Sequence, residues 1–168
     1  MPAEKFAIPA VDVIIEHPGE EKILMQLRWK PELDPLNTGT WELPGGKVTE
    51  FEDIFQAVRR EAFEETGLSL YGVREKKLGA HSDSRRGEKG FTFKPFLCWQ
   101  TTKGRFPYIC LFFIAKGKGM LRPQQGETRQ PEWKSLEEVQ KLLKGKKVYP
   151  LHVEALKEYL RQKKSGKL

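Results

Sequence analysis

The chain has 168 residues and a formal net charge of +7, with 32% charged and 38% hydrophobic residues. These values exclude a disordered or membrane-embedded chain and favour one globular domain over residues 1–168, with a basic C-terminal tail at about 161–168. Neither a secretion signal nor a membrane-spanning run is visible, so we expect a cytoplasmic protein without a membrane partner.

Strand patterns dominate the first part of the chain. Apolar runs at 5–15 and 22–29 predict two strands joined by a turn at 17–20. A polar loop at 30–39 and a short extended segment at 40–44 follow.

A helix is predicted next, over about 53–66. Gly67 stands in its C-cap position, and Thr49 and Glu52 have the spacing of a capping box at its start.

The second half mixes strands and helices. We predict strand character at 68–82, a loop at 83–90, a hairpin of 91–100 with 105–117, a loop at about 117–131, a helix from Ser135 to Gly145 and a last helix from Pro150. The cysteines, Cys98 and Cys110, lack C-x-x-C spacing, and we interpret both as buried free thiols. The fold class is α/β, a mixed sheet with helices on both sides.

The helix at 53–66 has an apolar stripe that becomes acidic. Glu61 and Glu65 lie seven and eleven residues after Ile54, within about 20° of its direction on a helix. Two carboxylates on a buried face need a cation between them.

The surrounding segment is acidic as well. Residues 42–65 hold seven acids and three bases, a balance of −4, so the rest of the chain carries +11. Clustered oxygen ligands suit Mg²⁺ or Mn²⁺. The three histidines, His17, His81 and His152, are distant in sequence, and we interpret each as a surface or packing residue.

The spacing of these residues resembles a known signature. Gly46, five residues, Glu52, seven residues and then REAFEETGL, from Arg60 to Leu68, fill every fixed position of the Nudix box. The chain is thus similar to the Nudix hydrolases. This resemblance implies an α/β/α sandwich and hydrolysis of a pyrophosphate bond in a nucleoside diphosphate-linked substrate.

The resemblance also implies roles for individual residues. The implied metal ligands or supports are Glu52, Glu61, Glu64, Glu65 and the carbonyls of Gly45 and Gly46. Arg60 would hold the carboxylate cluster in place. The catalytic base stays open between Glu61, Glu64 and a loop acid, with Glu127 and Glu132 as the loop candidates.

Substrate recognition is less defined by the sequence. Arg28 and Trp133 are candidates to bind the phosphate or base of a small nucleotide. The substrate class stays open between (deoxy)nucleoside triphosphates, ADP-ribose and nucleotide sugars. Two alternatives are a non-catalytic nucleotide sensor of the same fold and an RNA-end pyrophosphohydrolase, although nucleic acid is the less favoured partner. A homodimer is compatible with the resemblance.

Overall fold

The computed structural model describes residues 5–83, 85, 87–124 and 126–168. Its strands are β1 (Ile8–Glu16), β2 (Lys22–Arg28), β3 (Trp41–Glu42), β4 (Gly45–Lys47), β5 (Ser69–Tyr71), β6 (Lys77–Asp83), β7 (Glu88–Phe93), β8 (Leu97–Gln100), β9 (Tyr108–Lys118) and β10 (Thr128–Ser135). Its helices are α1 (Ile54–Thr66), α2 (Leu136–Lys144), the short 3₁₀ helix η1 (Pro150–His152) and α3 (Val153–Lys164).

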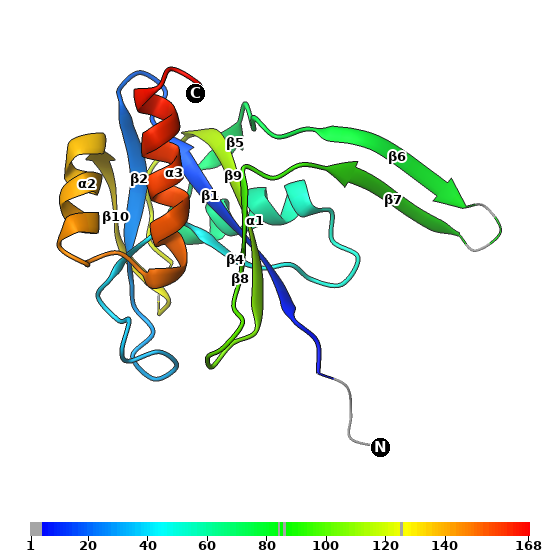
Figure 1. The fold of residues 1–168 in the computed structure, drawn as a ribbon, viewed down its shortest axis with the longest axis horizontal. Coiled ribbons are helices and arrows are strands. Elements are labelled where there is room, and N and C mark those ends of the chain that lie inside the picture. The colour runs from blue at the N-terminus through cyan, green and yellow to red at the C-terminus, as the bar shows by residue number, and fades with distance from the viewer. Residues whose placement is uncertain (1–4, 84, 86, 125) are drawn as a thin grey trace.

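One mixed sheet forms the centre of the molecule (Figure 1). Its main order is β10-β2-β1-β9-β5, with β3 paired to β2, β4 to β1 and β8 to β9. β1 and β9 run parallel, whereas the other pairs are antiparallel. β1 and β9 are rich in buried apolar residues, apart from Asp12 in the middle of β1, because both faces of this part of the sheet are covered.

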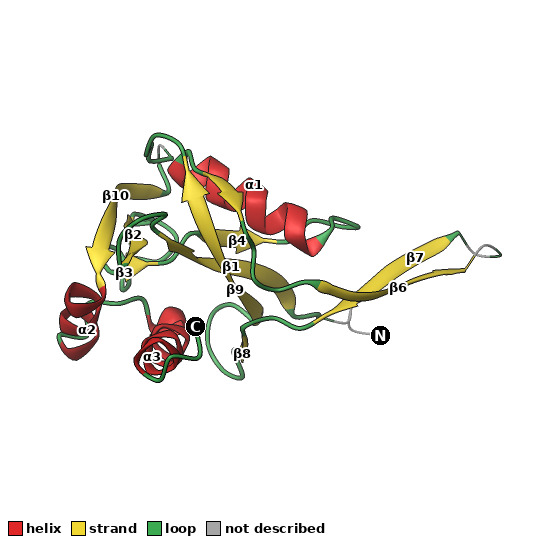
Figure 2. Ribbon diagram, turned by 90° about the horizontal axis from the view of Figure 1, so that it is seen from above, coloured by secondary structure: helices red, strands yellow, loops and turns green. Residues whose placement is uncertain are grey.

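Helices cover both faces of the sheet, which confirms the predicted α/β class (Figure 2). On one face, Val11, Val13 and Ile15 of β1 belong to the core cluster that includes α1. On the other, Ala10 and Ile14 belong to the cluster that includes α2 and α3. The two clusters alternate along β1 because successive strand side chains point to opposite faces.

α1 forms nearly where the sequence predicts it, but with a different N-cap. Asp53 accepts a 2.9 Å hydrogen bond from the backbone N–H of Phe55. The predicted capping box is therefore wrong: the Glu52 carboxylate accepts hydrogen bonds from Thr49 and stays outside the helix. Gly67 ends the helix with φ 75°, a left-handed conformation that favours glycine.

The middle of the chain differs from the prediction. Phe91–Phe93 belongs to β7, which pairs with β6 in a separate two-stranded sheet, and residues 83 and 88–90 of the predicted loop are strand. This hairpin extends away from the central sheet (Figures 1 and 2). Positions 84 and 86 of that loop lie outside the described residues. β8 and β9 form the predicted hairpin. Cys98 on β8 is exposed, contrary to the prediction, while Cys110 is buried.

The last third contains one strand that the sequence analysis missed. β10 occupies part of the predicted loop at 117–131 and pairs with β2 at the sheet edge. The capping box of α2 is confirmed, with Ser135 and Glu138 bonded reciprocally. The basic residues predicted as a tail begin inside α3. Among the described residues, no helix is long and apolar enough to cross a membrane.

Candidate functional site

A cleft of about 850 Å³ lies where α1, β4 and the loop after β2 come together. The predicted site residues that line it are Arg28, Gly45, Gly46, Glu61, Glu64, Glu65 and Glu127. Lys30, Glu42, Asp12 and His152, which the sequence analysis did not select, also line it. The fold therefore joins the acidic end of α1 to basic residues that follow β2.

Arg60 organises three carboxylates beside this cleft. Its guanidinium binds Glu52 through two nitrogens, at 2.7 and 2.9 Å. It also donates to Glu61 at 2.7 Å and to Glu64 at 3.2 Å. The Arg60 contact lowers the pKa of Glu52 to about 2, whereas burial raises the pKa of Glu61 against the influence of Arg60. Arg60 thus occupies the position that its predicted supporting role requires.

The two glycines of β4 allow the backbone to lie against the acidic residues. A Cβ at position 46 would lie 2.4 Å from the Glu61 carboxylate. A Cβ at position 45 would lie 2.2 Å from the Val11 carbonyl oxygen and 2.4 Å from an Asp12 carboxylate oxygen. At position 45 the close atoms include backbone, so only glycine fits there, whereas a side chain at position 46 would force the Glu61 carboxylate to move.

Glu65 is the most deeply buried carboxylate of the Nudix-like stretch, with 3% of its surface exposed. One of its oxygens accepts hydrogen bonds from Gln26 Nε2 at 2.6 Å and from the Gly45 N–H at 3.0 Å. Both donors are neutral. Burial, and next the nearby Glu42 carboxylate, raise the pKa of Glu65 to about 8. A buried carboxylate with this environment stabilises an added cation strongly.

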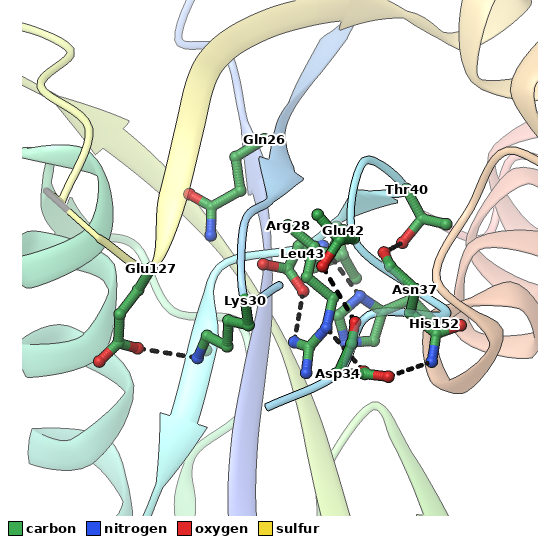
Figure 3. A network of polar contacts seen from close by, with 12 residues as sticks. Gln26, Arg28, Lys30, Asp34, Asn37, Thr40, Glu42, Leu43, Glu127 and His152 are labelled. Atoms are coloured by element: carbon green, nitrogen blue, oxygen red, sulfur yellow. Dashed lines mark hydrogen bonds and ion pairs between the residues drawn. The ribbon is translucent and has the colours of Figure 1, made fainter. Parts of the chain in front are cut away.

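A second acidic group, Glu42 and Asp34, surrounds Arg28 (Figure 3). Arg28 bridges Glu42 and Asp34, each at 3.0 Å, and its guanidinium lies 4.4 Å from the centre of the Tyr149 ring. Burial raises the pKa of Glu42 although Arg28 opposes the shift. Arg28 therefore lies in the cleft, with its position fixed by two carboxylates.

His152 joins the cleft wall to β1. Its Nδ1 accepts a 2.9 Å hydrogen bond from the Leu43 N–H, so Nδ1 carries no proton and Nε2 does. Nε2 lies 3.2 Å from Asp12 Oδ1. His152 is buried here, so its interpretation as a packing residue misses its polar contacts at the site.

The two predicted loop acids lie in different places. Glu127 precedes β10 and forms a 2.7 Å ion pair with Lys30 inside the cleft. Glu132 is on β10, not on a loop, and pairs with Lys134. Trp133, the predicted base-binding residue, packs edge-on against His17 and joins the core cluster of α1. The structure thus brings Glu127, but neither Glu132 nor Trp133, to the cleft.

The carboxylates fit a divalent cation in chemistry but are not arranged as a ready-made metal site. Within the described part of the chain, no group of three or more acidic, histidine or cysteine side chains converges on one point. Arg60 holds Glu61 and Glu64, while Glu65 turns toward Gln26 and Gly45. A cation would replace these hydrogen bonds, and the burial of Glu65 beside two neutral donors favours that exchange.

Some of the missed residues had a signal in the sequence. Glu42 is an acid in a short strand directly before the glycine pair, and Lys30 directly follows the Arg28–Trp29 stretch. His152 had no comparable signal, since its partner Leu43 lies 109 residues earlier in the chain.

Comparison with known families gives one match. The family model described as the NUDIX domain matches residues 7–156, which is most of the chain. No curated protein matched.

Solved structures resemble the fold closely. The MutT protein from Methanosarcina mazei Go1 has a TM-score of 0.64 and 22% identity, covering 96% of this chain and 99% of its own. A structure from a study of MutT from Aliivibrio salmonicida and Vibrio cholerae has a TM-score of 0.63 and 19% identity, covering 94% and 99%. The E. coli ORF135 protein has a TM-score of 0.59 and 22% identity, covering 94% and 91%. At these identities the likeness shows the fold alone.

Proposed function

Since this chain belongs to the Nudix family, whose members are generally pyrophosphohydrolases, we propose that it hydrolyses a pyrophosphate bond in a nucleoside diphosphate-linked substrate. The substrate classes in view are (deoxy)nucleoside triphosphates, ADP-ribose and nucleotide sugars. One observation supports this most directly: Glu61, Glu64 and Glu65 line the same cleft as Arg28 and Lys30. Such a cleft offers carboxylates to a divalent cation and cations to a polyanion.

The proposal assigns the divalent cation, Mg²⁺ or Mn²⁺, to Glu61, Glu64 and Glu65, supported by Glu52 and the backbone of Gly45 and Gly46. When bound, the cation would neutralise the diphosphate and acidify an attacking water. Arg60 keeps the carboxylates of Glu52, Glu61 and Glu64 together on the substrate side of α1.

When the water attacks, its oxygen forms a bond to phosphorus and the P–O–P bridge breaks. A carboxylate must accept the proton that the water loses. Among the acids left open by the sequence, we assign this role to Glu127, because it lies in the cleft and is half exposed. Glu61 and Glu64 are instead held by hydrogen bonds from Arg60 and are assigned to the cation. Glu127→Gln should therefore lower kcat more than Glu132→Gln.

The experiment that tests the proposed function is product analysis on a substrate panel with Mg²⁺. The panel contains normal and oxidised nucleoside triphosphates, ADP-ribose, nucleotide sugars, dinucleoside polyphosphates and triphosphorylated RNA. Glu65→Gln should lower turnover by about 100-fold or more. Glu154→Gln, on the exposed side of α3, is the matched control and should leave turnover unchanged. Wild-type turnover by Glu65→Gln would remove this cleft from the mechanism.

Nucleotide binding without hydrolysis is the second candidate function. It is favoured by one observation, that Arg60 already occupies Glu61 and Glu64. Tight, metal-dependent nucleotide binding with no turnover of any panel substrate would support this candidate over the first.

The proposal also places the protein in the cytoplasm, with a small nucleotide as its partner. Both cysteines are free, and Cys98 is exposed, which favours a reducing compartment.

A further inference from the structure

Lys30 lines the cleft together with Glu42, Glu65 and Glu127. Its Nζ forms a 2.7 Å ion pair with Glu127, and 22% of its side chain is exposed (Figure 3). Burial lowers the pKa of Lys30, but Glu127, Glu65 and Glu42 together raise it above its ordinary value. The ammonium is therefore a cation held by the field of the same carboxylates that the proposed function assigns to catalysis.

Lys30 differs from the two arginines of the cleft, Arg28 and Arg129, in how firmly it is fixed. Arg28 contacts two carboxylates and the Tyr149 ring. The Arg129 guanidinium stacks on the Trp29 ring at 3.6 Å. The direct partner of Lys30 is Glu127, whose side chain is 51% exposed, and an ion pair with an exposed carboxylate is weak. A flexible four-carbon chain also lets the ammonium move several ångströms.

We infer that Lys30 occupies the acidic cleft before a divalent cation arrives and then moves to bind the diphosphate of the substrate. The inference rests on the proposed function and adds a second task to one residue. A divalent cation near Glu65 repels the ammonium, and the phosphate oxygens attract it. Its departure also frees the Glu127 carboxylate from an ion pair. Metal loading thereby couples to substrate binding and to release of the proposed base.

The first test titrates the substrate-free protein with Mn²⁺ and measures the affinity by isothermal titration calorimetry. Because the ammonium opposes the cation, Lys30→Met should bind Mn²⁺ roughly threefold to tenfold more tightly than the wild type. Lys157→Met is the matched control, since Lys157 pairs with Glu154 on the exposed side of α3 at 2.7 Å. It should leave Mn²⁺ affinity unchanged. Equal or weaker Mn²⁺ binding by Lys30→Met would overturn the exchange.

The second test measures the affinity for methylenediphosphonate, a diphosphate that cannot be hydrolysed, at saturating Mg²⁺. Lys30→Met should bind it about tenfold more weakly, whereas Lys30→Arg should retain most of the affinity. Unchanged affinity in Lys30→Met would overturn the phosphate-binding role.

The two tests also separate this inference from the proposed function. Normal Mn²⁺ binding and turnover in the wild type, with no change in Lys30→Met, would overturn the inference alone. Failure of the wild type to bind Mn²⁺ would overturn both, because the carboxylates would then hold no cation to exchange with Lys30.

Discussion

Glu16 and Glu65 are both buried carboxylates, yet their surroundings shift their pKa values in opposite directions. Glu16, at the end of β1, contacts Lys163 at 2.7 Å, Arg74 at 2.8 Å and the Tyr159 hydroxyl at 2.8 Å. Burial raises its pKa, but these three groups outweigh burial and lower it. Glu65 has two neutral donors and a neighbouring acid.

The difference separates a structural carboxylate from one available for function. Glu16 brings two elements, the β5–β6 connection and α3, to the sheet by supplying them with a countercharge. Glu65 accepts hydrogen bonds from neutral groups and forms no ion pair within the described residues. A buried acid of the second kind destabilises the fold and at the same time favours an added cation.

The largest expected effect is on stability at pH 8. The pKa of about 8 lies above the ordinary 4.5, so the folded protein keeps a proton that the unfolded chain loses. Wild-type stability therefore falls as the pH rises through this window. Glu65→Gln keeps the acceptor for Gln26 and Gly45, and should raise the free energy of unfolding of the metal-free protein by about 4 kcal/mol at pH 8. Urea unfolding at pH 8 and pH 4.5 measures it, and an equal effect at both pH values would contradict the assignment.

The same substitution at Glu16 should change the free energy of unfolding in the opposite direction. Glu16→Gln leaves Lys163 and Arg74 without a countercharge and should lower the free energy of unfolding by about 2 kcal/mol at pH 7. The lowered pKa of Glu16 means that its contribution exists above the ordinary 4.5 and is lost as the pH falls through the folded-state value. Turnover per folded molecule should not change. A stabilised Glu16→Gln would remove the distinction between the two carboxylates.

Addition of Mg²⁺ should sharpen the comparison further. At about ten times its Kd, Mg²⁺ should stabilise the wild type by about 1.4 kcal/mol. Glu16→Gln should gain the same amount, while Glu65→Gln should gain much less. Thermal unfolding with and without Mg²⁺ gives the three differences, and equal gains in all three proteins would place the cation elsewhere.

The smallest effect should come from an exposed pair. Lys77 contacts Asp53. Burial raises the pKa of Asp53, but Lys77 and the Phe55 N–H outweigh burial, so the pKa is lowered. Since half of the Lys77 side chain is exposed, Lys77→Met should change the free energy of unfolding by less than about 0.5 kcal/mol. A change as large as that of Glu16→Gln would mean that the contribution of an ion pair to the free energy of unfolding does not depend on its burial.

The sequence predicts the parts of the fold whose signals are local. α1 and α2 follow from helical periodicity and from Gly67 and the Ser135 capping box. β10 was missed because it is polar and lies at the sheet edge, with Pro131 at a break in its register with β2. The β6–β7 hairpin was missed because its strands cross the polar run that resembles a loop.

The site divides in the same way. The carboxylates of α1 were found because helix geometry puts Glu61 and Glu65 on the face of Ile54. The contacts of His152 and Lys30 depend on residues far away in the chain, at Leu43 and Glu127. Periodicity carries no information on such pairs, so these contacts could be found only from the structure.

The contacts of Glu16 also affect how the protein folds during its synthesis. A ribosome releases β1 long before Tyr159 and Lys163, which lie more than 140 residues later. Until α3 emerges from the ribosome, Glu16 lacks those two partners, and its carboxylate stays hydrated. We therefore expect the sheet to close late in synthesis, and nascent chains stalled before Tyr159 should be cut readily by a protease that spares the released protein.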